Sequence, residues 1–190
     1  AKRVKEMAQI DPFVANAAQI TSLGPITIAA MLVYIDIEKA QHASSLWSYV
    51  GIDKAAHERY EKGQAGGGNK TLRTVLFNFA SSQIKNRQSA YRYIYDRVRA
   101  KLDNSDKITY SRHAGKTGVH ENAWKDAPKS HRHMTALRAV NKHFLFDWLY
   151  VARTFAGLPV SRSYAETHLG ESHETSLPWE RGWKKPGELL

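Results

Sequence analysis

The chain has 190 residues and a mass of 21.5 kDa, which suits one domain of ordinary size or two small ones. Lys and Arg number 28 against 18 Asp and Glu, so the formal net charge is +10. This excess predicts a polyanionic partner, either nucleic acid or an anionic membrane surface. Hydrophobic residues make up 42% of the chain and it has no cysteine. These two facts exclude a disordered tail, a disulfide-stapled scaffold and a thiolate zinc site.

The N-terminal part is predicted to form short helices separated by prolines. Residues 4–20 read as one or two helices, and Asp11 can cap a helix that begins at Pro12. From Pro25 to Ile35 the sequence is apolar nearly all round, which predicts a buried helix, with a strand as the alternative. The expected inner positions of the first stretch are Val4, Met7, Ala8, Ile10, Phe13 and Val14.

The middle of the chain alternates helical and irregular stretches. A short helix is expected over residues 44–51, where Gly51 ends it. Residues 52–70 are polar and glycine-rich and predict an exposed loop, and helices resume over residues 71–84 and 90–102.

The last part is predicted to contain one long helix. Residues 103–129 read as irregular, Ser130 can cap a helix that runs through Ala156, and Gly157 ends it. The tail from Pro159 is expected to be extended or partly disordered. The inner stripe of the long helix should comprise Leu137, Val140, Phe144, Leu145, Trp148 and Val151.

The expected fold is therefore all-α, a helix-hairpin-helix core with additional packed helices and an irregular C-terminal tail. Three parts are predicted: residues 1–103 as the helix-hairpin-helix domain, 104–158 as the irregular segment with the long helix packed on it, and 159–190 as the tail. The uncharged residues 12–35 contain polar side chains and a Gly-Pro break, so we expect neither a membrane-spanning helix nor a membrane partner. We expect a cytoplasmic location. The histidines are scattered, and we expect neither a metal site nor another cofactor.

The string from Ile20 to Leu32 predicts a helix, a tight glycine turn and a second helix, the helix-hairpin-helix pattern. A glycine in such a turn lets the backbone approach a ligand closely, and the free amides of the following helix then form an anion site. This hairpin is expected to bind a phosphate of the nucleic-acid backbone without reading bases. An ordinary helical hairpin is the alternative, and Ser22 stands where the first hairpin glycine is usual. The candidate residues are Gly24, Pro25, Ile26 and Thr27.

Two further groups of residues suggest phosphate binding. Gly68, Asn69, Lys70 and Arg73 lie where a flexible loop enters a helix, and could form a phosphate cradle or merely a solvated linker. The helix over residues 90–102 interleaves arginines with tyrosines, which suits nucleic acid, although its polar face could equally be solvated. The candidates there are Arg92 and Arg99.

The order of these parts resembles a known family. The hairpin string LGPIT, the stretch WSYVG, the polar loop and the string GNKTLRTVLF together resemble the C-terminal, helix-hairpin-helix domain of Piv/MooV-type, bridge-RNA-guided insertion-sequence transposases. The resemblance covers residues 11–99 and continues more loosely into the long helix. It implies DNA as a partner, together with a guide RNA, and a homo-oligomer or larger nucleoprotein complex.

The resemblance also implies a RuvC-like domain with metal-binding carboxylates and a nucleophilic serine in the polar loop. Only about twenty residues precede the hairpin, too few for such a domain, and no serine occurs between Tyr49 and Ala80. Phosphodiester exchange through serine needs its hydroxyl in the site. The expectation is a DNA-binding domain that does not cut by itself. The alternative is a domesticated, non-catalytic component of a nucleoprotein assembly. A glycosylase of the helix-hairpin-helix type is disfavoured because no catalytic Lys-and-Asp arrangement follows the hairpin.

Overall fold

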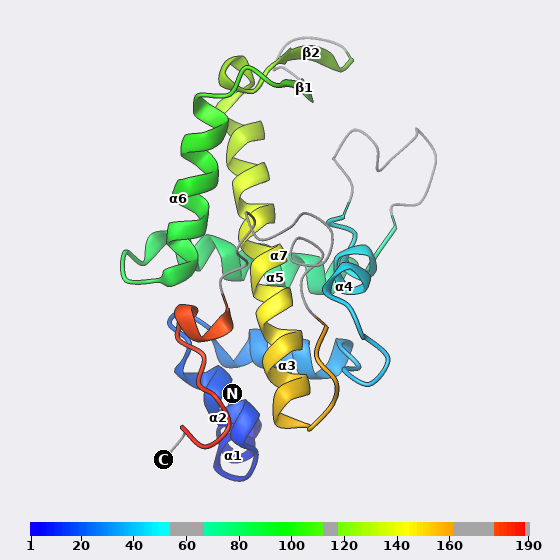
Figure 1. The fold of residues 1–190 in the computed structure, drawn as a ribbon, viewed down its shortest axis with the longest axis vertical. Helices are drawn as coiled ribbons and strands as arrows, with labels where there is room; N and C mark the ends of the chain where they lie inside the picture. Colours follow the sequence, from blue (N-terminus) through cyan, green and yellow to red (C-terminus); the bar gives the residue numbers. More distant parts are fainter. Residues whose placement is uncertain (54–66, 112–117, 162–176, 189–190) are drawn as a thin grey trace.

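The computed structural model describes residues 1–53, 67–111, 118–161 and 177–188. This part of the chain is mostly helical, which confirms the all-α class, and one small antiparallel sheet accompanies its seven α-helices (Figure 1). The helices are α1 (Lys2–Ile10), α2 (Pro12–Gln19), α3 (Pro25–Tyr34), α4 (Ala43–Val50), α5 (Lys70–Lys85), α6 (Ala90–Asp103) and α7 (Lys129–Phe155). The strands are β1 (Ile108–Ser111) and β2 (His120–Ala123), and two 3-10 helices are η1 (Trp124–Asp126) and η2 (Pro178–Arg181).

The predicted helix boundaries at Asp11 and Gly51 are confirmed. The Asp11 carboxylate accepts hydrogen bonds from the Phe13 and Val14 amides at 2.9 and 3.2 Å, so it caps α2, whose first residue is Pro12. Gly51 ends α4 in the left-handed conformation, with φ of 75°. The sequence signals at these two positions were therefore sufficient to place helix ends.

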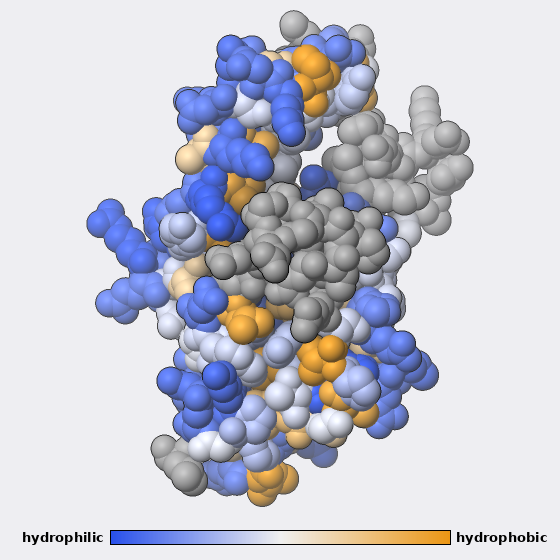
Figure 2. Space-filling model, in the orientation of Figure 1, coloured by the Kyte–Doolittle hydropathy of each residue, from blue (hydrophilic) through white to orange (hydrophobic). Residues whose placement is uncertain are grey.

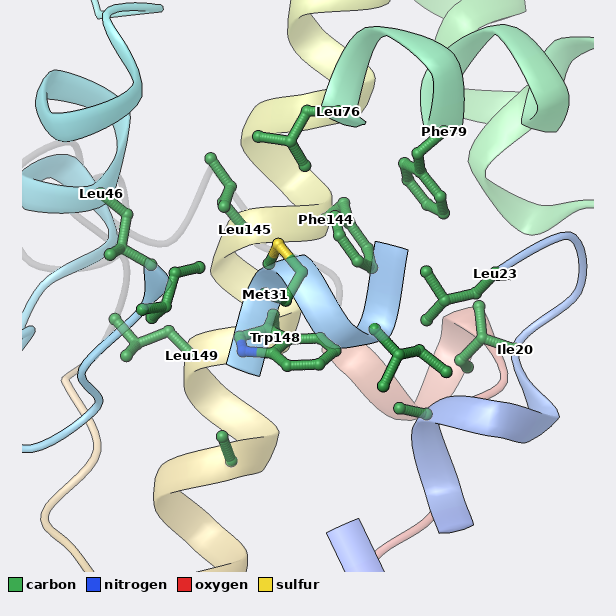
Figure 3. Packing of buried hydrophobic residues seen from close by; sticks show 14 of the residues in the cluster. Ile20, Leu23, Met31, Leu46, Leu76, Phe79, Phe144, Leu145, Trp148 and Leu149 are labelled. Atoms are coloured by element: carbon green, nitrogen blue, oxygen red, sulfur yellow. The ribbon is translucent and has the colours of Figure 1, made fainter. Parts of the chain in front are cut away.

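Helix α7 is the axis of the hydrophobic core. All six residues of its predicted inner stripe are buried, and α2, α4, α5 and α6 pack against it. Phe144 lies 4.0 Å from Phe79 of α5 between ring centroids, and Trp148 contacts Phe13 of α2 edge-on at 4.8 Å. Figure 3 shows Met31 of α3 in the same cluster as Phe144 and Trp148. The core therefore consists of side chains from the long helix and from the helices that precede it in the chain.

Three expectations for individual elements are wrong. Helix α3 is not buried all round: Ile26 and Val33 are 75% and 76% exposed, because only one of its faces packs on the core. Met7 and Ile10 of α1 are exposed rather than inner. Helix α7 begins at Lys129 with Pro128 as its N-cap residue and without a side-chain cap, so Ser130 lies inside the first turn.

The stretch between α6 and α7 is not wholly irregular. Strands β1 and β2 pair antiparallel with Ile108 opposite Ala123 and Ser111 opposite His120. Along β1 the side chains alternate between exposed and buried, so Thr109 and Ser111 face inward. The strands β1 and β2, η1, α6 and the start of α7 form an arm (residues 90–138) that projects from the rest of the molecule (Figure 1).

The C-terminal residues are anchored in the core. Trp183 is 1% exposed, stacks parallel to Phe13 at 6.3 Å, and donates its indole N–H to the Tyr91 hydroxyl at 2.9 Å. Arg181 donates two hydrogen bonds to the Asp147 carboxylate, at 2.5 and 2.6 Å. The tail from Pro159 is rich in Gly, Pro and Ser and contains no local signal that predicts this anchoring. The predicted three-part division of the chain stays a prediction.

The buried carboxylate of Asp147 is the centre of this anchor. It accepts the Tyr91 hydroxyl at 2.5 Å in addition to the two bonds from Arg181. Burial raises the pKa of Asp147 against the lowering effect of these bonds. Burial and the neighbouring carboxylate together raise the pKa of Tyr91 well above its ordinary value. One network of hydrogen bonds thus joins α6, α7 and the C-terminal residues.

Candidate nucleic-acid interface

The string for which a helix-hairpin-helix is predicted lies in α2, α3 and the loop between them, and we call this loop with the adjoining helix ends the hairpin. Ile20 and Leu23 are buried and fix the loop to the core, while the backbone reverses at Ser22 with φ of 59°. Among the described residues, Ser22 is the one non-glycine residue with a positive φ. A left-handed backbone is unfavourable for an ordinary side chain, so the serine at this glycine position keeps the hairpin turn at some energetic cost.

Gly24 is exposed at the start of α3 and leaves the helix N-terminus open. It is the N-cap residue, with φ of −79° and ψ of 160°, and no side chain caps the helix. A Cβ atom built on Gly24 would meet nothing within 4 Å. Because the first amides of a helix lack intrahelical partners and Pro25 has no N–H, the Ile26 and Thr27 amides are the donors at this end. The positive end of the helix dipole lies at the same place and favours an anion.

The hairpin tip rests on the end of α5. Gln83 is fully buried, donates to the Thr21 carbonyl at 2.7 Å, and accepts from the hydroxyl of Ser89, the N-cap residue of α6. At the surface, Asn86 donates to the Ser22 hydroxyl at 3.3 Å. The hairpin is therefore held at a fixed position beside the turn that joins α5 to α6.

The Gly-Asn-Lys segment at the other end of α5 is rigidly built. Gly68 has φ of 86°, and a Cβ there would lie 2.6 Å from the Gly51 nitrogen, so the glycine is required by close backbone contact with the end of α4. The Asn69 side chain caps α5 by accepting from the Leu72 amide at 2.9 Å, and it donates to the Tyr49 hydroxyl at 3.0 Å. These contacts give Gly68 and Asn69 a structural role that is sufficient to explain them.

Lys70 and Arg73 differ in their surroundings. Lys70 is exposed at the first position of α5, while Arg73 donates to the Gly67 carbonyl at 3.3 Å. Helix α5 has 16 residues, so the hairpin and this segment lie about 24 Å apart at its opposite ends. The two predicted phosphate sites therefore cannot hold the same phosphate.

The two candidate arginines of α6 are held by the protein itself. Arg92 donates to the Ile84 carbonyl at 2.6 Å and pairs with Asp96 at 3.2 Å. Arg99 donates to Asp103 at 3.0 Å and to the Lys129 carbonyl at 2.9 Å, which ties α6 to the start of α7. Both lie on one flank of α6 with their carboxylate partners, so much of their charge is compensated locally.

Other cations near the hairpin are exposed instead. Lys85 and Arg87 flank Asn86, the residue that contacts the hairpin tip, and Arg97 and Lys101 lie further along α6. None of the four forms an ion pair with another described residue. The predicted candidates Arg92 and Arg99 do not include these four, because sequence alone cannot separate arginines bound by carbonyls and carboxylates from exposed ones.

The resemblance implies a nucleophile in the polar loop predicted over residues 52–70, and residues 54–66 of that loop lie outside the described residues. Of the two threonines that follow, Thr71 is exposed, and the Thr74 hydroxyl donates back to the Lys70 carbonyl at 3.1 Å. In the described ranges no three His, Asp or Glu side chains gather as a metal site, and none of the helices there is long and apolar enough to cross a membrane.

Residues 14–95 match a family model described as Transposase IS116/IS110/IS902 family. The matched segment begins in α2, contains the hairpin and all of α5, and ends within α6. No curated protein and no solved structure matches the chain. Over residues 14–95 the chain is therefore similar to an IS110-type transposase domain.

Proposed function

We propose that this protein is a nucleic-acid-binding domain of a transposase or recombinase, and that its α2–α3 hairpin binds one backbone phosphate. The observation that carries the proposal is the open N-terminus of α3. Gly24, on which a Cβ atom would meet nothing within 4 Å, stands before the free amides of Ile26 and Thr27, and the hairpin is fixed through Gln83. A preorganised site of this kind binds an anion without a change of conformation.

We further propose that the domain does not cut DNA by itself. The supporting observation lies in the sequence, because no serine occurs between Tyr49 and Ala80, where the resembling family has its nucleophile. Guide RNA is proposed as a second ligand on the basis of that resemblance, and a nucleoprotein complex as the working assembly. The same missing serine favours the second candidate function, a non-catalytic structural component of such an assembly.

The test compares two substitutions at one position. Gly24→Asp introduces a good N-cap residue into open space, and its negative charge is favourable at a helix N-terminus, so folding should be preserved. The same carboxylate occupies the anion site and repels phosphate. Gly24→Asn has nearly the same shape without the charge and is the matched control.

Binding is measured by fluorescence anisotropy with duplex DNA over a series of salt concentrations. Wild-type protein should show a log–log salt slope of about −0.9 per phosphate contact. Gly24→Asp should weaken binding roughly tenfold or more, a loss of about 1.4 kcal/mol, and Gly24→Asn clearly less, both with unchanged circular dichroism. A wild-type protein that does not bind at low salt refutes the nucleic-acid function. A Gly24→Asp variant that binds normally refutes the role of the hairpin.

A further inference from the structure

One face of α6 carries a row of exposed side chains at helical spacing, Tyr93, Arg97 and Lys101, which we call the α6 stripe. They are four residues apart, so successive members lie about 6 Å apart along the helix. Tyr93 is 67% exposed, and the Arg97 guanidinium lies 5.8 Å from the centre of its ring. All three side chains are exposed, whereas Tyr91, which lies nearly opposite Tyr93 on the helix, is buried in the core.

The positive charges of the α6 stripe have no carboxylate partners among the described residues, unlike those on the flank of α6 that carries Arg92 and Arg99. On the other flank Arg92 pairs with Asp96, and Asp103 pairs with both Arg99 and Arg132. Arg97 and Lys101 form no hydrogen bond or ion pair with any described residue. A cation with no carboxylate partner can exchange its water and counterions for a phosphate without first breaking a salt bridge.

The excess positive charge of the protein is concentrated on the arm. Residues 90–138 contain 11 Lys and Arg against 5 Asp and Glu, so the arm holds +6 of the formal charge of +10. Most of the arm lies beyond the segment that matches the transposase family model. Hydrophilic residues predominate on the α6 side of the arm (Figure 2). Such a field attracts a polyanion to a part of the molecule for which the family match predicts nothing.

The stripe continues from the hairpin. Asn86, in the turn before α6, contacts the hairpin tip at Ser22, and the exposed Arg87 follows it. Figure 1 shows the α2–α3 loop, the α5–α6 turn and α6 following one another along the same side of the molecule. Helix α6 has 14 residues and extends this side by about 21 Å. A backbone held at Gly24 would therefore meet Arg87 first and the α6 stripe next.

We infer that the α6 stripe is a second nucleic-acid contact, and that a duplex held at the hairpin runs along α6, with its phosphates against Arg97 and Lys101. This inference rests on the proposed function and adds a ligand path to it. The chemistry recognised is the phosphate backbone, which DNA and RNA duplexes share. Tyr93 holds the Arg97 guanidinium over its ring and so limits the conformations that binding must restrict.

The test compares two variants, each of which lacks two positive charges, one variant in the α6 stripe and the other on α1. The variant Arg97→Ala/Lys101→Ala alters the stripe, and Lys2→Ala/Lys5→Ala removes the same net charge from exposed positions on α1, at the opposite end from the arm (Figure 1). All four side chains are exposed, so both variants should fold, as circular dichroism will show. Each full-length variant is titrated with salt against DNA and RNA duplexes of about 30 base pairs, long enough to cover the whole path.

The stripe variant should lower the magnitude of the salt slope by about 2, since each lost contact on duplex DNA removes about 0.9. The α1 variant should leave the slope unchanged. A loss with the DNA duplex, the RNA duplex or both supports the inference and identifies the ligand. Equal losses in the two variants would mean that binding follows net charge alone, and an unchanged slope in the stripe variant would mean that the path avoids α6. Either result overturns the inference while the Gly24 test of the hairpin still stands.

Discussion

The buried Gln83 side chain donates to the Thr21 carbonyl at 2.7 Å and thereby fixes the hairpin that we propose to bind phosphate. The same amide accepts from the hydroxyl of Ser89. One side chain thus connects three elements, the hairpin, the end of α5 and the start of α6. A site of backbone amides has no side chains of its own to orient it, so its precision depends on contacts of this kind.

We predict that Gln83→Leu weakens both stability and nucleic-acid binding. The substitution leaves the Thr21 carbonyl and the Ser89 hydroxyl without their partner in a buried place, which costs about 1–3 kcal/mol. Gln88→Leu, at an exposed position in the neighbouring turn, is the matched control. Urea denaturation and anisotropy on the same samples check the prediction. Wild-type binding by a destabilised Gln83→Leu protein would show that the hairpin does not need this support.

We predict that the two glycines before Asn69 respond differently to alanine. In Gly68→Ala the new Cβ would lie 2.6 Å from the Gly51 nitrogen at a backbone φ of 86°, whereas a Cβ on Gly67 would meet nothing within 4 Å. Gly68→Ala should therefore destabilise the protein by about 1–3 kcal/mol, and Gly67→Ala by less than about 0.5 kcal/mol. The melting temperatures of both variants, measured by thermal denaturation, test this difference. Similar melting temperatures would contradict the close packing of this segment on the end of α4.

We predict strong coupling between Asp147 and Arg181. Arg181→Met leaves a buried carboxylate without its cation and should cost about 3–5 kcal/mol. Adding Asp147→Asn removes the charge and keeps an oxygen that can accept the Tyr91 hydroxyl, so the double variant should recover part of that loss. The measurement is a double-mutant cycle by urea denaturation. Additive effects of the two substitutions would be evidence against the pair as the anchor of the C-terminal residues.

We predict that the protein alone neither nicks DNA nor forms a covalent adduct with it, with or without magnesium. The reason is the missing serine between Tyr49 and Ala80. Tyr60, outside the described residues, is the one hydroxyl of that loop that a recombinase could use in its place. Incubation with supercoiled plasmid followed by denaturing electrophoresis checks this. An adduct that disappears in Tyr60→Phe would make the protein an enzyme after all.

The helices were predictable from local signals, because their ends depend on neighbouring residues. The Asp11-Pro12 pair, Gly51 and the apolar periodicity of α7 each determine structure within one or two turns. The exposed face of α3 was not predictable in the same way. Apolar residues all round a helix indicate burial, but Ile26 and Val33 find no partner helix in the described fold.

The candidate site was predictable only in part, because its outcome depends on distant contacts. The string LGPIT indicates a helix that begins after Gly24, and Gly24 is the exposed N-cap residue of α3, while its role in phosphate binding stays a prediction. Whether an arginine is exposed depends on carbonyls and carboxylates elsewhere in the fold: Arg99 reaches the Lys129 carbonyl, 30 residues away, while Arg97 is exposed and lies over the Tyr93 ring. Composition alone does not contain that information. The strands β1 and β2 were missed for a related reason, since four-residue strands are too short to show a period.

The pairing of Asn16 with Lys184 has a consequence for the order of assembly. The Asn16 amide exchanges two hydrogen bonds with the Lys184 backbone, at 2.8 and 3.0 Å, across 168 residues of sequence. Beside it, Trp183 covers Phe13. During synthesis from the N-terminus, α2 is made early, and almost the whole chain must be synthesised before Trp183 and Lys184 can pack on it. Ribosome-bound chains that end before Trp183 should therefore leave one face of the Phe13 ring uncovered, although Trp148 is already present, and these late contacts would be the last to form.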